Sequence, residues 1–401
     1  NGKQNLSINP SQNNFNSQNP SNSAAKKKNS VFFRQSWIEI DKSDYLFNLK
    51  KIREFVSKSA KIMPVLKSNG YGHGLVELGR ETQNAGFNYI AVFSLEEGIE
   101  LREAGVKTNI LILDEIYPFE NLEAAVAHDL TPTISTMASL MAIEHLAVRL
   151  QKRISFHLEI DTGMGRAGAS PETAFQIIQK IAQTPEVSMT GMFTHFSVAD
   201  TDPVFTKHQL KTFLSIVKYA HSNFGLRFIA HAANSAAIFK DARNHLDMVR
   251  PGIAVYGISP FKNSEKTVKL KPVLTWKTKI TLLKKVPSGA GISYGRTFVT
   301  NKSSQIAIIP VGYGDGYNRL LSNQGEVLIR GKRCPIAGRI TMNMTMIDAT
   351  GVKGVSLGDE VVLIGSQGKE QITADEIAKD LDTISYEVLC AISPNIPRIL
   401  V

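Results

Sequence analysis

The sequence predicts an α/β protein in which an N-terminal (β/α)₈ barrel of the TIM type is followed by a C-terminal, mostly-β domain. Short apolar runs alternate with amphipathic helical stretches from about residue 37 to residue 270. Roughly eight such units over roughly 230 residues match the size and period of a (β/α)₈ barrel. After Leu270 the pattern changes to alternating strands with turn signals, which is typical of a β domain.

Three segments follow from this pattern. Residues 1–36 are rich in Asn, Ser and Gln and contain few apolar side chains. Such a stretch cannot bury enough surface to offset the entropy of ordering it. We therefore expect a disordered polar tail at 1–36, the barrel at 37–270 and the β domain at 271–401.

The barrel strands are expected where apolar runs are bounded by loops and helices. They are Ile62–Leu66, Tyr89–Ser94, Asn109–Leu113, Thr131–Ser135, Ile154–Ile160, Met189–Thr194, Arg227–Ala230 and Ile253–Tyr256. The helices between them are expected at Leu75–Ala85, Leu95–Ala104, Met137–Leu150, Pro171–Ile181 and Val204–His221. In the second domain, strands are expected at Trp276–Leu283, Gln305–Pro310, Glu326–Ile329, Met342–Asp348 and Glu360–Ile364, with a short helix near Ala374–Leu381.

Composition excludes several classes of protein. The 401 residues are 43% hydrophobic and 20% charged, as in ordinary globular proteins. The net charge is +10, but the basic residues are scattered, apart from Lys26–Lys28, so we expect no nucleic-acid partner. No apolar run approaches the roughly 20 residues that span a bilayer, so we expect no membrane insertion.

The cysteines argue against a disulfide framework and against a metal site. Cys334 and Cys390 are too few and too far apart for either. We expect a reducing, cytoplasmic location. The chain begins at Asn1 rather than Met, which leaves a periplasmic or exported protein open.

Lys67 is the first candidate reactive residue. In (β/α)₈ barrels the chemistry is built at the C-terminal ends of the strands, and Lys67 directly follows an apolar run and precedes three glycines in the segment 67–74. A lysine desolvated there can act as a Schiff-base nucleophile and as a base. The alternative is a lysine that leaves the barrel mouth for solvent.

Other strand ends carry polar groups of the same kind. Glu159 to Arg166 follow the fifth run, Thr194 and His195 the sixth, and His231 the seventh. Ser235 and the amides of Gly252 and Ile253 are candidate phosphate ligands, because helix starts and Gly-opened turns direct N–H groups at anions.

The segment Gly163–Gly168 matches the G-x-G-x-x-G pattern of dinucleotide sites. It follows about the fifth strand of the series rather than the first, and a lone match of this motif is weak. We therefore do not interpret it as a dinucleotide site.

Taken together, these motifs resemble the alanine racemase family, and the resemblance runs colinearly from about Trp37 to the C-terminus. The motifs are Lys67–Gly74, Asp161–Arg166, Thr194–Phe196, His231–Ala236, Arg250–Gly257, Ser293–Thr297, Gly312–Tyr317, Ser385–Glu387 and Pro397–Arg398. The resemblance implies a pyridoxal 5′-phosphate (PLP) enzyme of fold type III. It also implies a head-to-tail homodimer.

The resemblance assigns the catalytic roles. Lys67 looks like the lysine that forms the Schiff base with PLP and acts as one of two bases. Tyr294 looks like the opposing base, contributed to the barrel of the other subunit, and two bases on opposite faces of a planar carbon suit a racemase. His195 resembles the residue that hydrogen-bonds this tyrosine. Arg250 resembles the residue that faces the pyridine nitrogen, and it cannot donate a proton there because arginine stays protonated.

It also assigns the binding residues. Tyr71, Ser235, Gly252 and Ile253 match positions that bind the cofactor phosphate. Arg166 and the Met342 amide match positions near the cofactor phenol and the substrate carboxylate, and Tyr313 is similar to a substrate-binding tyrosine.

Three positions depart from the family pattern. Glu159 stands where many members carry a carbamylated lysine, and we expect its carboxylate to orient Arg166 by a charge-assisted hydrogen bond. Asn343 replaces an aspartate, and Pro394 replaces a tyrosine of the inner gate. A less charged and less closed pocket could admit side chains larger than methyl.

The expected function is interconversion of L-alanine and D-alanine, which supplies D-alanine for cell-wall peptidoglycan. The alternative is a broad-specificity amino-acid racemase of the same family. PLP decarboxylases of similar arrangement use a cysteine near the active site, and no such pattern surrounds Cys334 or Cys390. Single-barrel PLP-binding proteins end after the barrel, whereas this chain continues.

Overall fold

The computed structural model describes residues 35–261 and 268–401. The predicted tail, residues 1–36, lies outside the described residues except for its last two. The predictions that the structure bears on are therefore those for the barrel and for the second domain.

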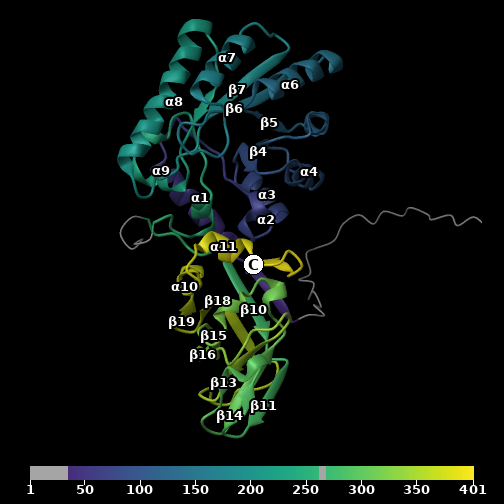
Figure 1. Ribbon diagram of the computed structural model, residues 1–401, viewed down its shortest axis with the longest axis vertical. Helices are drawn as coiled ribbons and strands as arrows, with labels where there is room; N and C mark the ends of the chain where they lie inside the picture. Colours follow the sequence, from purple (N-terminus) through teal and green to yellow (C-terminus); the bar gives the residue numbers. More distant parts are fainter. Residues whose placement is uncertain (1–34, 262–267) are drawn as a thin grey trace, which may run out of the picture. The chain divides into compact units, whose positions relative to one another are not determined.

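Eight strands form a parallel sheet in the order β2-β9-β8-β7-β6-β5-β4-β3. They are β2 (Lys61–Ile62), β3 (Tyr89–Val92), β4 (Asn109–Glu115), β5 (Thr131–Ile134), β6 (Ile154–Glu159), β7 (Val187–Phe193), β8 (Ile229–His231) and β9 (Met248–Val249). A parallel bridge between Val65 and Ala91 joins the first strand region to β3. The Leu66 amide donates to the Ala91 carbonyl at 2.8 Å, so the sheet nearly closes. The predicted barrel is confirmed (Figure 1).

Helices cover the outside of this sheet. They are α1 (Lys42–Phe55), α3 (Leu75–Asn84), α4 (Leu95–Glu103), α5 (Leu122–Ala127), α6 (Met137–Leu150), α7 (Pro171–Ile181), α8 (Pro203–Phe224) and α9 (Ser235–Lys240). The short segment α2 (Lys67–Tyr71) lies instead at the mouth of the barrel, and its backbone is left-handed at residues 68–70. The ends of the helices follow local chemistry. For α8, the Asp202 carboxylate accepts from two backbone amides of the first turn, Pro203 supplies a fixed φ, and Gly225 ends the helix at φ +62°.

The second domain is built on two antiparallel-rich sheets and a hairpin. One sheet has the order β16-β15-β18-β10-β1-β20 with β19 beside β18, another has the order β11-β14-β17, and β12 pairs with β13. Their bounds are β1 (Ser36–Ile40), β10 (Leu274–Lys279), β11 (Leu282–Val286), β12 (Gly291–Ile292), β13 (Phe298–Val299), β14 (Ser304–Ile309), β15 (Glu326–Ile329), β16 (Lys332–Pro335), β17 (Thr345–Asp348), β18 (Glu360–Gln367), β19 (Glu370–Ile372) and β20 (Arg398–Leu400). Two short helices, α10 (Ala374–Asp380) and α11 (Ser385–Cys390), precede β20.

Three strand predictions need correction. The predicted strand Trp276–Leu283 is divided between β10 and β11, which belong to different sheets. The apolar run Ile253–Tyr256 is a 3₁₀ turn, η3, and the eighth barrel strand is β9, just before Arg250. The run is fully buried without being extended, because Gly252 starts a tight turn that Gly257 ends at φ +84°. The first strand is also shorter than expected, since β2 ends at Ile62.

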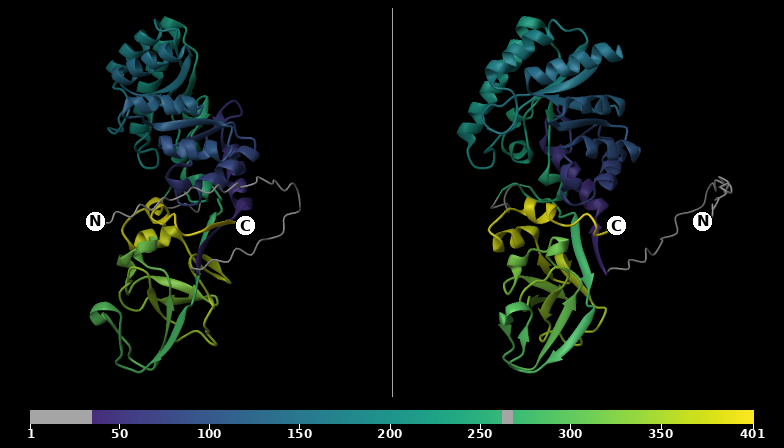
Figure 2. Two further views of the ribbon diagram at one scale, coloured as in Figure 1. Left: turned by 90° about the vertical axis from the view of Figure 1, so that its right-hand side faces the viewer. Right: turned by 45° about the vertical axis from the view of Figure 1, so that its right-hand side comes forward.

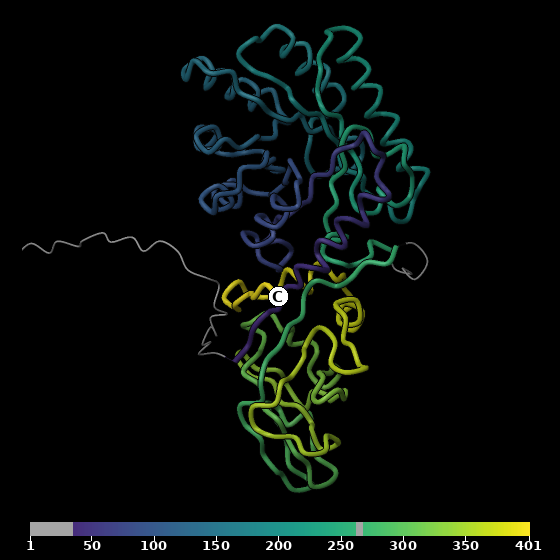
Figure 3. Tube along the Cα trace, turned by 180° about the vertical axis from the view of Figure 1, so that it is seen from behind, coloured from purple at the N-terminus to yellow at the C-terminus, as the bar shows by residue number. Residues whose placement is uncertain are grey.

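β1 lies in the second sheet although it precedes the barrel in sequence. It pairs antiparallel with β10 and parallel with β20. Figure 3 lets the reader follow the purple chain from this strand into α1. The residue bounds predicted for the domains stay predictions. However, most of β1 lies in the range predicted for the barrel, although the strand belongs to the sheet of the second domain. It begins at Ser36, the last residue of the predicted tail.

The core is continuous from the barrel into the segment that leaves it. Asn48 of α1 binds this segment on both sides: its Nδ2 donates to the Lys271 carbonyl at 2.8 Å and its Oδ1 accepts from the Lys271 amide at 2.9 Å. α11 packs against α2, and Figure 2 shows the yellow C-terminal elements beside the purple chain around α2. Across residues 35–261 and 268–401, no helix combines the length and apolar character needed to cross a membrane.

Candidate active site

Lys67 begins a left-handed turn at the mouth of the barrel. Ser68, Asn69 and Tyr71 have φ values of 56°, 54° and 52°, and the two glycines among and after them have φ values of 60° and 81°. For residues other than glycine this conformation costs roughly 1–2 kcal/mol each. Such strain persists only where the surroundings over-determine it, and it concentrates at functional sites.

The Lys67 amine lies in a partly desolvated, cationic environment. Burial lowers its pKa, and the charge of Arg166 lowers it further, against smaller opposing effects of Cys390 and Glu97. The amine lies 5.7 Å from the centre of the Phe93 ring. A lower pKa raises the fraction of neutral amine, which is the nucleophilic form. The interpretation as a reactive lysine is thereby favoured over one that merely extends into solvent.

Arg250 is buried at the centre of the mouth and is 4% exposed. It donates to the Thr194 carbonyl at 2.7 Å and to His231 Nδ1 at 2.9 Å. Its guanidinium lies 5.1 Å from the centre of the Phe193 ring. Burial lowers its pKa to about 10, with Glu159 opposing the shift. Arg250 therefore keeps its charge at neutral pH.

The hydrogen bonds of Arg250 fix the protonation of two histidines. Because a guanidinium only donates, His231 must accept at Nδ1 and carry its proton on Nε2. Nε2 then donates to His157 Nδ1 at 3.0 Å. Burial is the main cause that lowers the pKa of His231 and of His157, the latter to about 3. Both rings are therefore neutral supports of Arg250.

His195 lies on the open side of the same arginine. Its Nδ1 is 3.4 Å from Arg250 Nη2. Burial, followed by the charges of Arg250, Arg166 and Lys67, lowers the pKa of His195 to about 3. The structure thus brings His195 to the cationic cluster, whereas its predicted bond to a tyrosine of a second subunit stays a prediction.

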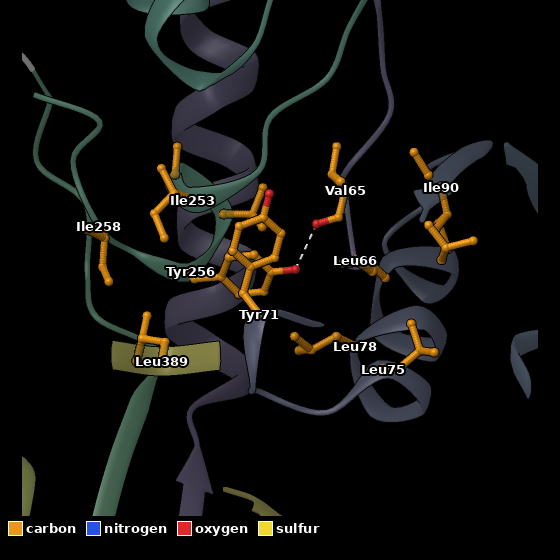
Figure 4. Packing of buried hydrophobic residues seen from close by; sticks show 14 of the residues in the cluster. Val65, Leu66, Tyr71, Leu75, Leu78, Ile90, Ile253, Tyr256, Ile258 and Leu389 are labelled. Carbon is orange, nitrogen blue, oxygen red and sulfur yellow. Dashed lines mark hydrogen bonds between the residues drawn. The ribbon is translucent and has the colours of Figure 1, made fainter. Parts of the chain in front are cut away.

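Three predicted phosphate residues converge at the end of β9. The Gly252 amide donates to Ser235 Oγ at 2.9 Å, and a Cβ on Gly252 would lie 2.6 Å from Tyr71 Oη. Ile253 begins η3, and first-turn amides have no partner within their own helix. Figure 4 shows the Tyr71 ring packed on Tyr256, whose hydroxyl donates to the Val65 carbonyl. Two hydroxyls and a Gly-opened turn therefore form a cradle that suits a phosphate.

The Gly163–Gly168 segment is fixed from within. The Asp161 carboxylate accepts from the amides of Gly163, Met164 and Gly165 at 2.9–3.1 Å. These N–H groups already donate to Asp161, so they are not free to bind the phosphates of a dinucleotide.

One predicted contact is wrong. Among the described residues, Glu159 makes no hydrogen bond or ion pair with Arg166, and the Arg166 side chain is exposed. Glu159 is 7% exposed, and burial raises its pKa to about 7, while Arg250 and then Arg166 oppose that rise through their charges. The glutamate therefore acts on both arginines only at a distance.

The other predicted site residues lie on the second domain. Tyr294, Met342 and Tyr313 are 73%, 57% and 43% exposed. Tyr313 and Met342 are neighbours, since the Tyr313 amide donates to Thr341 O and the Gly314 amide to Met342 O. Figure 1 shows β13, which follows Tyr294 by four residues, well separated from α2, which carries Lys67. One chain therefore does not bring Tyr294 to Lys67. The departures Asn343 and Pro394 are likewise exposed.

Sequence reasoning missed the residues that hold the Lys67 turn. Glu97 accepts from the Ser68 amide at 2.5 Å, and Arg398 donates to the Gly72 carbonyl at 3.0 and 3.1 Å. Ser94 and Glu97 have the spacing of a capping box, a signal that predicts the cap of α4 but not the contact with Ser68. Within 35–261 and 268–401, no group of three or more His, Cys, Asp or Glu side chains is arranged to hold a metal.

Comparisons with known proteins agree with this geometry. The family model described as the alanine racemase N-terminal domain matches residues 40–260, and the model of the alanine racemase C-terminal domain matches residues 273–400. An alanine racemase from Halothermothrix orenii is 44% identical over 369 residues, which cover 91% of this chain and 96% of the relative. One from Methylacidiphilum infernorum is 43% identical over 364 residues, covering 91% and 92%.

Solved structures give the same result. Alanine racemase from Clostridium difficile 630 superposes with a TM-score of 0.86 at 35% identity, over 92% of this chain and 97% of that one. The Bacillus anthracis alanine racemase with bound L-Ala-P gives a TM-score of 0.85 at 34% identity, over 93% and 96%. The likeness thus covers both the barrel and the second domain along nearly the whole length. The chain belongs to the alanine racemase family.

Proposed function

We propose that this chain is a PLP-dependent racemase that interconverts L-alanine and D-alanine and so supplies D-alanine for peptidoglycan. The observation that carries the proposal is that a desolvated lysine, a buried arginine and a phosphate cradle occupy one barrel mouth. The names of the relatives, which are alanine racemases at 38–44% identity, support the same activity.

The residues at the mouth fit PLP. Lys67 would supply the amine that binds PLP, and Arg250 would face its pyridine nitrogen. The phosphate would be held by Tyr71, Ser235, Gly252 and the amide of Ile253. PLP when bound withdraws electrons from the substrate Cα and makes its proton easier to remove.

Each residue then has a defined task. Lys67 Nζ removes or returns the Cα proton on one face. The partner subunit's Tyr294 does the same on the opposite face, which inverts the centre. Because Arg250 keeps its proton, it gives none to the ring nitrogen, and this favours return of the proton to Cα. Arg166 and Met342 are assigned to the substrate carboxylate, with Tyr313 closing the pocket.

A second subunit follows from the exposure of Tyr294. A single chain leaves this side chain 73% exposed, and other large apolar side chains of the same domain are also exposed, namely Leu320 at 65% and Met344 at 50%. We therefore propose a homodimer in which Tyr294 acts across the interface.

The test is chiral analysis of purified protein with added PLP, incubated separately with L-alanine, L-serine, L-lysine and L-arginine. We expect D-alanine, and none from the Lys67→Ala variant. D-lysine or D-arginine at comparable rates would assign the broad-specificity alternative and link it to Asn343 and Pro394. Absence of any racemisation with PLP demonstrably bound would refute the proposal.

A further inference from the structure

The strained turn that carries Lys67 is held from the barrel side by Glu97. One carboxylate oxygen, Oε1, accepts from the Ser68 and Asn69 amides at 2.5 and 3.3 Å. The other oxygen accepts from the Phe93 and Ser94 amides at 2.9 and 3.4 Å. The side chain therefore ties the first N–H groups after Lys67 to the start of α4.

The same turn is held from the opposite side by Arg398, at the start of β20. Its Nε and Nη2 donate to the Gly72 carbonyl at 3.1 and 3.0 Å. Its remaining N–H groups donate to three carbonyls of its own segment, those of Ile392, Ser393 and Ile396. Every N–H group of the guanidinium thus donates to a backbone carbonyl. These hydrogen bonds fix the segment 392–398 against Gly72, at the end of the turn.

The C-terminal segment packs directly on Gly72 and also reaches Gly74. A Cβ on Gly72 would lie 2.2 Å from the Leu389 carbonyl oxygen, and one on Gly74 would lie 3.8 Å from Arg398 Cγ. The Tyr71 and Tyr386 rings lie 6.0 Å apart. Contact therefore extends from α11 to β20 along the whole turn.

We propose that Glu97 and Arg398 are positioning residues, which clamp the left-handed turn and thereby set the position of the Lys67 amine. The second domain of a chain thus completes the site of its own barrel. This inference rests on the proposed function for its catalytic consequence. Loss of either clamp releases the residues Ser68–Tyr71 to ordinary φ values, because relief of roughly 1–2 kcal/mol per residue favours that change.

The test compares Arg398→Ala and Arg398→Lys with a matched control, Arg102→Ala. Arg102 also spends its guanidinium on backbone carbonyls, those of Val106, Thr108, His128 and Asp129, but these belong to loops away from Lys67. Loss of either arginine removes a comparable set of hydrogen bonds. Thermal unfolding of each variant measures that shared structural cost.

The specific readout is the reactivity of the Lys67 amine in protein without added PLP. Competitive acetylation with acetic anhydride across pH, read by mass spectrometry against the exposed Lys285, gives the apparent pKa of Lys67. We expect Arg398→Ala to move that pKa upward toward the ordinary lysine value by at least about 0.5 unit, and Arg398→Lys to give a smaller shift. Arg102→Ala should leave it unchanged at a similar loss of thermal stability.

Glu97→Gln tests the other side and also serves if Arg398→Ala does not fold. The amide can accept only through its oxygen, so its NH₂ group faces backbone donors and one half of the clamp fails. Because the Glu97 charge itself raises the Lys67 pKa, the readout for this variant is kinetic: we expect kcat to fall roughly tenfold with little change in KM, as for loss of alignment. Equal labelling of Lys67 in wild type and Arg398→Ala, or an unchanged kcat in Glu97→Gln, would overturn the proposal. Because labelling needs no turnover, this failure is distinct from an absence of racemase activity.

Discussion

Glu159 is a buried carboxylate near two arginines, but burial affects its pKa more than their charges do. It faces Arg250 and Arg166, as well as the acidic Asp161 and Asp114, and desolvation is the largest effect on its pKa, which is raised to about 7. The arginines oppose the rise but do not reverse it, because neither makes a direct hydrogen bond to it in the described structure. The sequence predicted a charge at this position, but the tertiary structure decided how much of that charge is present at neutral pH.

This raised pKa predicts how stability depends on pH. The folded protein holds the Glu159 proton up to about pH 7, whereas the unfolded chain releases it near 4.5. Between these values the unfolded state binds fewer protons, so the free energy of unfolding falls as pH rises. The full loss is on the order of 3 kcal/mol, at about 1.4 kcal/mol for each pKa unit.

We therefore expect Glu159→Gln to remove most of this decline. Urea unfolding at pH 5 and pH 8, on protein without added PLP, measures it for wild type and variant. Glu120→Gln is the matched control, because Glu120 is an exposed glutamate of the same barrel. An equal decline in wild type and in Glu159→Gln would contradict the assignment.

At the scale of single elements, the turn after Lys67 shows how packing overrides local preference. Asn is among the few residues other than glycine that tolerate left-handed backbone, whereas Ser and the bulky Tyr rarely adopt it, yet all three adopt it here. Hydrogen bonds from Glu97 and Arg398 and the close approach of α11 hold them. The glycines in the sequence predicted a tight turn, but nothing in the local sequence predicted what packs on it.

This arrangement predicts a position-specific cost for glycine replacement. Gly72→Ala must strain φ +81° and also place a Cβ against the Leu389 carbonyl. Gly225→Ala strains a similar φ of +62° with nothing within 4 Å, so it should cost only about 1 kcal/mol. We expect Gly72→Ala to destabilise by several times that amount, on the order of 3–5 kcal/mol, as measured by chemical unfolding. Similar values for the two variants would show that α11 does not press on the turn.

The short elements show where sequence patterns fail. α10 has a Thr373 cap that marks its start, and it was predicted. α11 begins after Ile384, which provides no side-chain cap, and it was missed. β9 has two residues, too few for any periodicity, so the apolar run after it was wrongly taken for the eighth strand.

At the scale of the whole molecule, the two proposed bases lie on different domains of one chain. Lys67 lies at the barrel mouth and Tyr294 on an exposed loop of the second domain. In the homodimer proposed above, a site that uses both is formed by two chains. Lys67→Ala and Tyr294→Ala then damage every site of their own homodimers, but in different ways.

This predicts complementation in mixed dimers. Unfolding and refolding an equimolar mixture of the two inactive variants should restore roughly a quarter of wild-type activity, because about half of the dimers are mixed and each has one intact site. Each variant refolded alone is the control. Absence of recovery, with mixed dimers demonstrated by tagged pull-down, would exclude a site shared between subunits.

The sequence by itself determined the architecture and the reactive groups. Periodicities of apolar residues reflect burial, and burial is local to each strand or helix, so α6 and α7 were predicted to the residue. The sequence also predicts Lys67, Ser235 and Arg250 as site residues, because the barrel collects strand ends at one mouth. Only the tertiary structure decided that β1 joins the second sheet, that the pKa of Glu159 is raised, and that Arg398 reaches Gly72 across 326 positions. These outcomes depend on desolvation and on contacts between distant segments, and no pattern within a short stretch of sequence encodes either.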